Sequence, residues 1–178
     1  FCNAHAYRYF RDSSVTWESE CQPFLELYGR IYELEREAEN DEQKEQAREQ
    51  MRPLFSEIIN QCESAKADAM PNSSFEKAIN YFSNHVSGLS KCLANIEIPL
   101  DNNFSERLLR SPVIGRKTWY GTHSKRGAHT NAILFSLVES CKINGINPRN
   151  YFVWITEQIH TKKEILTPSQ YANHIDSG

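Results

Sequence analysis

Two carboxylates lie close together in residues 97–110, EIPLDNNFSERLLR, and raise the possibility of metal binding. Asp101 and Glu106 are five residues apart, and an arginine follows the glutamate directly. Carboxylate oxygens are ligands that Mg²⁺ prefers. A structural role is the alternative, because Asn103 and Glu106 have the spacing of a capping box and Asp101 is typical of a turn. The spacing alone favours the structural role.

A basic segment follows these carboxylates. Residues 107–126 contain six basic side chains and no acidic one: Arg107, Arg110, Arg116, Lys117, Lys125 and Arg126. Trp119 lies among them. Basic side chains beside aromatic rings can neutralise phosphates and stack on bases, so the segment is a candidate DNA-binding surface. A solvated surface loop is the alternative.

Composition sets limits on the class of protein. The chain has 178 residues, a formal net charge of -3, 39% hydrophobic and 24% charged residues. These values are typical of a globular protein with one domain, or a domain with a sub-domain. Five widely spaced cysteines predict reduced thiols in a cytoplasmic protein. No apolar run approaches the roughly 20 residues of a membrane helix.

Hydrophobic periodicity predicts a mainly α fold with few strands. Helices are expected after Ser73, which has a capping-box partner in Glu76, and over 128–144 and 148–159. Two further helices are expected to form an antiparallel hairpin turning near 40–41, with a kink or a new helix start at Pro53. Strand patterns are limited to NIEIPL at 95–100 and KTWYGT at 117–122. Residues 161–178 are expected to form a loosely ordered tail.

The segment 101–152 resembles the C-terminal signature of transposases of the insertion-sequence-sixty-six family. That signature runs D-N-N-x-x-E-R-x-x-R, then G-R-K-x-W, then an A-I-L-x-S-L-I-E-T-A-K-like helix and N-G-x-x-P-x-x-Y. The opening CNAHAYRYF resembles the family's C-W-A-H-x-R-R-K-F. The matching positions are Asp101, Asn102, Asn103, Glu106, Arg107, Arg110, Gly115, Arg116, Lys117, Trp119, Ser136, Leu137, Glu139, Lys142, Asn144, Gly145, Pro148 and Tyr151.

The resemblance implies a DDE transposase with an RNase H-like α/β catalytic domain. In such enzymes three acidic residues hold two magnesium ions, and the resemblance makes Glu106 the third of them, with Asp101 a further candidate. The basic residues 107–126 would hold DNA, both transposon ends and target. A homodimer is plausible by analogy with other transposases, and no membrane role is expected.

The domain division follows from the same resemblance. Residues 1–12 are expected to be a helix of the catalytic core, 13–95 a helical insertion, and 96–160 the C-terminal part of the core. The family's first two aspartates precede the Cys-x-x-His segment, so we expect the isolated chain to be inactive. A non-catalytic DNA-binding or self-association module is the alternative function. An unrelated helical interaction domain is a third.

Cys2 and His5 have the spacing of half a zinc site. No second pair lies at a suitable spacing, so buried packing is the favoured interpretation. The role of the two residues is not readable from the sequence.

Overall fold

The structure is a computed structural model that describes residues 2–118 and 121–176, apart from the side chain of Asp176. Within these residues every regular element is helical, which confirms the mainly α prediction. The chain divides into two compact units, Phe1–Phe104 and Ser105–Gly178. We call them unit 1 and unit 2. None of the described helices is long and apolar enough to cross a membrane.

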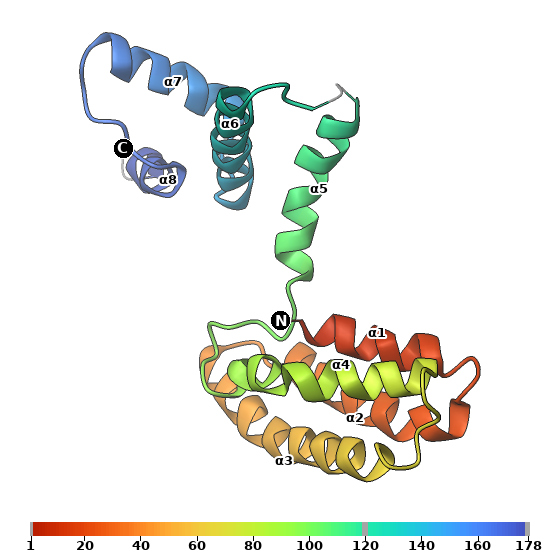
Figure 1. Cartoon of the computed structure of the whole chain (residues 1–178). Coiled ribbons are helices and arrows are strands. Elements are labelled where there is room, and N and C mark those ends of the chain that lie inside the picture. Colours follow the sequence, from red (N-terminus) through yellow and green to blue (C-terminus); the bar gives the residue numbers. More distant parts are fainter. Residues whose placement is uncertain (1, 119–120, 177–178) are drawn as a thin grey trace. The chain divides into compact units, whose positions relative to one another are not determined.

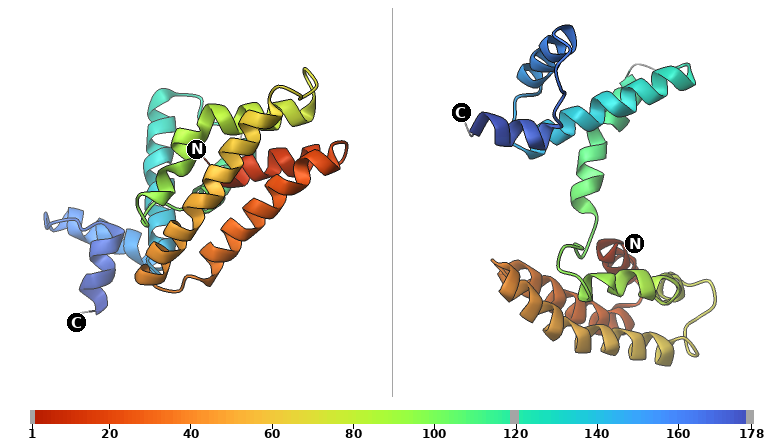
Figure 2. Two further views of the ribbon diagram at one scale, coloured as in Figure 1. Left: turned by 90° about the horizontal axis from the view of Figure 1, so that it is seen from below. Right: turned by 90° about the vertical axis from the view of Figure 1, so that its left-hand side faces the viewer.

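Unit 1 is a bundle of four helices (Figures 1 and 2). They are α1 (Asn3–Ser13), α2 (Glu18–Glu37), α3 (Asp41–Ala65) and α4 (Ser74–Leu89), followed by the short 3-10 helix η1 (Ser90–Leu93). Helix α1 packs against α2 and α4, and α2 forms the predicted antiparallel hairpin with α3. The core is apolar and rich in aromatic rings. Its largest fully buried side chains include Tyr28, Phe10, Phe55 and Phe82.

Side-chain caps define where two of these helices begin. The Asn40 side chain accepts a hydrogen bond from the Gln43 amide at the start of α3. Ser73 caps α4 as predicted, through a 3.0 Å bond from the Glu76 amide. The Glu76 carboxylate, however, accepts from the Asn72 amide at 2.6 Å, one residue earlier than a standard capping box requires.

The structure bears on two sequence predictions within unit 1. Of the kink or new helix start expected at Pro53, the new start is wrong, because α3 runs through the proline as one helix with core residues on both sides of it. Residues 95–100 form turns rather than a strand. The Asn95 side chain accepts from the Glu97 amide at 2.8 Å, and the Asn95 carbonyl accepts from the Ile98 amide. This local bonding takes up the backbone groups that a strand would offer to a partner.

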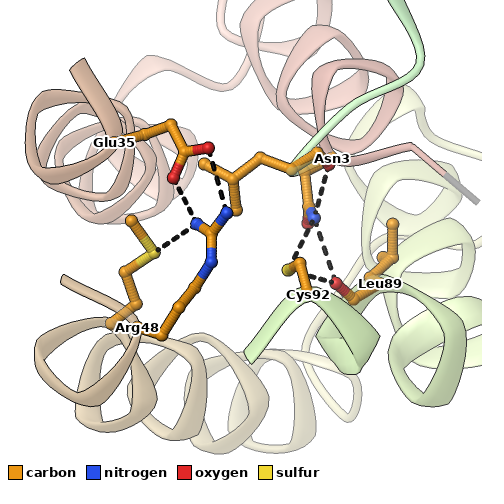
Figure 3. Close-up of polar contacts among 7 residues, drawn as sticks. Asn3, Glu35, Arg48, Leu89 and Cys92 are labelled. Carbon is orange, nitrogen blue, oxygen red and sulfur yellow. Dashed lines mark hydrogen bonds and ion pairs between the residues drawn. The ribbon is translucent and has the colours of Figure 1, made fainter. Parts of the chain in front are cut away.

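An ion pair lies inside unit 1 (Figure 3). The Arg48 guanidinium is almost fully buried and pairs with both carboxylate oxygens of Glu35, one of them at 3.0 Å. It also contacts the Met51 sulfur, and its Nε has no hydrogen-bond partner. Arg48 thus places a charge at the junction of α2 and α3, where Glu35 is its counter-ion.

Unit 2 contains most of α5 (Asn103–Thr118) and the helices α6 (Lys125–Ile143), α7 (Pro148–His160) and α8 (Pro168–Asp176). Gly145 has a positive φ of 68°, as predicted for the residue after α6. Asn147 caps α7 and Pro148 occupies its first turn, also as predicted.

The segment 161–178, expected to be a loosely ordered tail, contains a helix in its described part. Residues 168–176 form α8, which packs against α6. The Tyr171 ring lies 5.4 Å from that of Tyr151 and 4.7 Å from that of Trp154, measured between centroids. These aromatic contacts give the short helix a fixed place.

Candidate active-site segment and nucleic-acid interface

Unit 1 brings together two motifs that lie about 100 residues apart in sequence. The start of α1, with Cys2 and Asn3, meets the segment 100–103. The Asn3 amide donates to the Leu100 carbonyl at 3.1 Å, and the Asn102 amide contacts the Cys2 sulfur at 3.4 Å. The Cys-x-x-His segment and the D-N-N segment therefore form one structural feature, which we call the motif junction (residues 2–8 and 100–103).

Asn3 is the central polar residue of the motif junction (Figure 3). Its side chain is 1% exposed and donates to the carbonyl oxygens of Leu89 at 3.1 Å and Leu100 at 3.0 Å. The Tyr28 hydroxyl donates to its side-chain oxygen at 3.4 Å. One buried amide thus connects the start of α1, the end of α4 and the chain that leads into α5.

A second contact fixes the first residue of α5. The Arg8 guanidinium donates to the Asn103 side-chain oxygen at 3.0 Å. Asp101, which is half-buried, accepts from the Asn103 amide at 2.9 Å. The Asp101 carboxylate therefore has the turn-forming role that the sequence offered as its structural alternative.

Tyr32 lies beside Asp101 with a buried hydroxyl. Burial, and then the negative charge of Asp101, raise the pKa of the Tyr32 hydroxyl well above its usual range. The Asp101 carboxylate thus has two neighbours, the Asn103 backbone amide and the Tyr32 side chain.

The two carboxylates of the sequence motif belong to different units. Asp101 is in unit 1, whereas Glu106 is in unit 2, in the first turn of α5. Glu106 is exposed, and no described side chain of α5 is buried. Nowhere in 2–118 or 121–176 do three His, Cys, Asp or Glu side chains gather as a metal site would require. Cys2 is buried, in agreement with the packing role favoured for it.

The predicted DNA-binding cations are exposed side chains of α5 and α6. Arg107, Arg110, Arg116 and Lys117 are on α5, and Lys125 and Arg126 form the first turn of α6. Trp119 lies outside the described residues. The sequence gives unit 2 ten basic and five acidic residues, a formal charge of +5, and unit 1 ten basic and eighteen acidic, a charge of -8. The net charge of -3 is therefore the sum of a basic unit 2 and an acidic unit 1.

The start of α6 combines several groups that favour anions. Ser124 caps the helix by accepting from the Gly127 amide at 3.0 Å. Lys125 and Arg126 follow at the positive end of the helix dipole, where basic side chains are electrostatically unfavourable unless an anion is bound. An open hollow of about 680 Å³ lies at this end, and its lining includes His123, Ser124 and Arg126 but not Lys125.

The sequence did not identify Asn3, Arg8 or Tyr32 as functional positions. Asn3 stands where the resembling family motif has tryptophan, so the motif does not single it out. Its role depends on contacts across 86 and 97 residues of sequence, which no local pattern reveals. The one available signal was the joint presence of two motifs, which indicated a shared site without indicating which side chains connect them.

Comparison with known proteins identifies the family. The sequence model described as Transposase IS66 family matches residues 1–130, and the chain belongs to this family. Among curated proteins it is similar to two from Sinorhizobium fredii (strain NBRC 101917 / NGR234), both named as uncharacterized. They are y4jD, 30% identical over 163 residues, and y4hP, 27% identical over 175 residues. Each alignment covers 89% of this chain and 32% of the relative.

The chain therefore spans about a third of the length of the curated relatives that it matches. No solved structure matches it.

Proposed function

We propose that this chain is part of a DNA transposase in which Glu106 is the third acidic ligand of a two-magnesium site. The observation that carries the proposal is the family match across residues 1–130, which contains the D-N-N-x-x-E-R motif with an exposed Glu106. The complete protein would have an RNase H-like catalytic domain, with 1–12 and 96–160 in the core and 13–95 as a helical insertion.

The residues present are suited to one part of such a metal site. The Glu106 carboxylate supplies hard oxygen ligands, and a position in the first turn of a helix restricts its motion. The remaining ligands would come from outside this chain. When bound, the two ions would activate a water or a 3′-hydroxyl and stabilise the leaving oxygen at phosphorus. This division of ligands also explains why we expect the isolated chain to be inactive.

Substrate binding would be the task of the basic side chains. Arg107 and Arg110 follow Glu106 on the same helix, at spacings that allow contacts with successive phosphates. The capped start of α6 offers backbone amides together with Lys125 and Arg126. The positive charge of unit 2 supports DNA as the partner. The complete protein would act in the bacterial cytoplasm.

A specific observation also favours a second function for the isolated chain. Its excess of positive charge lies in unit 2, while the described residues contain no complete metal site. The 178-residue chain alone would therefore bind DNA, or a second copy of itself, without cutting or joining strands.

The proposal is tested in the complete encoded protein by strand cleavage and joining on paired transposon ends with Mg²⁺. The Glu106→Gln variant should lose at least 100-fold in rate, while a thermal unfolding transition shows that the variant is folded. Glu157→Gln, which removes an exposed carboxylate of α7, is the matched control and should retain full activity. Equal rates for the wild type and Glu106→Gln would overturn the proposal.

A further inference from the structure

Unit 2 has too small a core for its size. Its fully buried hydrophobic residues among those described are Cys141, Ile146 and Tyr151, with partly buried neighbours such as Trp154 and Tyr171. Unit 1 has a far larger buried cluster. Since burial of apolar surface is the main stabilising contribution to a fold, unit 2 has little to stabilise it on its own.

Helix α6 carries apolar side chains on two of its sides. Leu137 and Cys141 face the small core with α7 and α8. Ile133 and Leu134 lie on or near that same face by helical spacing and remain 47% and 43% exposed. Phe135 lies on a different side of the helix. The small core therefore leaves much of the apolar surface of α6 uncovered.

A groove lies between α5 and α6, entirely within unit 2. It has a volume of about 710 Å³, and its lining includes Leu109 and Pro112 from α5 and Ala132, Phe135 and Ile143 from α6. Leu109 is 60% exposed and Ile143 is 54% exposed. Contiguous exposed apolar surface of this kind marks a place where another protein element packs.

We propose that this groove is the docking site for an apolar element of the same polypeptide that lies outside residues 1–178. The relatives are about three times as long as the matched region, so the family has further chain to supply such an element. A second copy of this chain is a poorer occupant. It would bring together two units of formal charge +5, each with Arg116 in the groove lining.

The docking has a consequence for α5. On α5, Leu109 and Pro112 line the groove. Glu106 and Arg110 belong to the same helix but do not line the groove. An element seated in the groove would therefore fix α5 through its apolar side chains. This inference does not depend on the role of Glu106, because packing alone determines it.

Thiol labelling of introduced cysteines tests the inference directly. The five native cysteines are buried, so an introduced surface cysteine can be followed separately by mass spectrometry of its peptide. Leu109→Cys and Ile143→Cys probe the groove. Ile159→Cys on α7 is the control, because Ile159 is 59% exposed and does not line the groove.

In the 178-residue chain all three variants should react at the rate of an exposed thiol. In the complete encoded protein, labelling of the Leu109→Cys and Ile143→Cys variants should slow at least tenfold, while the Ile159→Cys variant keeps its rate. Equal slowing of all three variants, or slowing of none, would overturn the inference. So would protection of the groove in the 178-residue chain that increases with protein concentration, because a second copy would then be the occupant.

Discussion

The side-chain amide of Asn3 donates a 3.0 Å hydrogen bond to the carbonyl oxygen of Leu100, 97 residues further along the chain. The same amide reaches the Leu89 carbonyl, so the last residue of α4 and the approach to α5 share one buried donor. In this way the bundle of unit 1 determines where the D-N-N segment begins. The two family motifs, far apart in sequence, are therefore in direct contact within unit 1.

Replacement of Asn3 by alanine should destabilise unit 1. The change removes the side-chain donor from the Leu89 and Leu100 carbonyl oxygens, each of which keeps one other donor, and should lower the free energy of unfolding by about 1 to 3 kcal/mol. Urea denaturation followed by circular dichroism measures this loss. Asn84→Ala, at an exposed position of α4, is the control and should change stability by less than about 0.5 kcal/mol. Equal free energies of unfolding for the two variants would show that the hydrogen bonds of the Asn3 side chain do not stabilise unit 1.

The two members of the buried ion pair should respond unequally to neutralisation. Glu35→Gln leaves the Arg48 charge buried without a counter-ion and should cost about 3 kcal/mol. Arg48→Met leaves a Glu35 side chain that is 29% exposed and can be hydrated, and it removes the unpaired Nε. Its loss of stability should therefore be the smaller one in urea denaturation. The reverse order would mean that Glu35, and not Arg48, carries the main desolvation cost.

Local sequence signals predicted the helices well and the contacts between them poorly. Ser73, Asn147 and Gly145 act within a few residues of their own positions, so their roles could be predicted from spacing. The alternation of isoleucines at 95–100 predicted a strand because no local pattern reveals whether a partner strand exists. In the structure the Asn95 turn takes up that backbone instead.

The candidate site was predictable only as a set of residue types. The resemblance singled out Glu106 and the cations around it, and these residues are exposed. The bonds of Asn3 and Arg8 that hold the motif junction join parts of the chain about 90 residues apart. Such bonds depend on the complete packing of unit 1. The charge difference between the units was visible in sequence as a basic segment, but the boundary at Phe104 required the structure.

Neutralisation of the first turn of α6 should weaken DNA binding and its salt dependence. The Lys125→Ala/Arg126→Ala double variant of the 178-residue chain loses two phosphate contacts. The slope of log affinity against log salt concentration for duplex DNA should then fall in magnitude by about 1.8. Fluorescence anisotropy titrations at several salt concentrations give this slope. Lys162→Ala/Lys163→Ala removes the same charge from the same unit and should leave the slope nearly unchanged.

If the control pair has the same effect, binding follows the overall charge of unit 2 and not a defined surface. That result would contradict the assignment of Lys125 and Arg126 as phosphate ligands.

The buried thiols should make stability depend on alkaline pH. Burial raises the pKa of Cys62 from 9.0 to about 12, and burial with the charge of Glu20 raises that of Cys21 to about 11. Between about pH 9 and 12 the folded chain therefore binds more protons than the unfolded chain. Stability should be constant with respect to these groups below pH 8 and fall as pH rises through this range.

Urea denaturation at pH 8 and pH 10.5 checks this expectation. The Cys62→Ala variant should lose less stability between the two pH values than the wild type does, whatever its stability at pH 8. An equal loss in both proteins would show that the Cys62 thiol does not contribute to the alkaline dependence.

The central claim, that Glu106 is a ligand of catalytic metal ions, is tested most directly by changing the ligand and the metal together. A thiolate binds Mg²⁺ poorly but tolerates softer ions such as Mn²⁺ better. In the complete encoded protein, Glu106→Cys should cleave transposon ends at least 100-fold more slowly than the wild type with Mg²⁺, and recover to within tenfold with Mn²⁺. A loss of the same size with both metals, or no loss with Mg²⁺, would contradict a ligand role for Glu106.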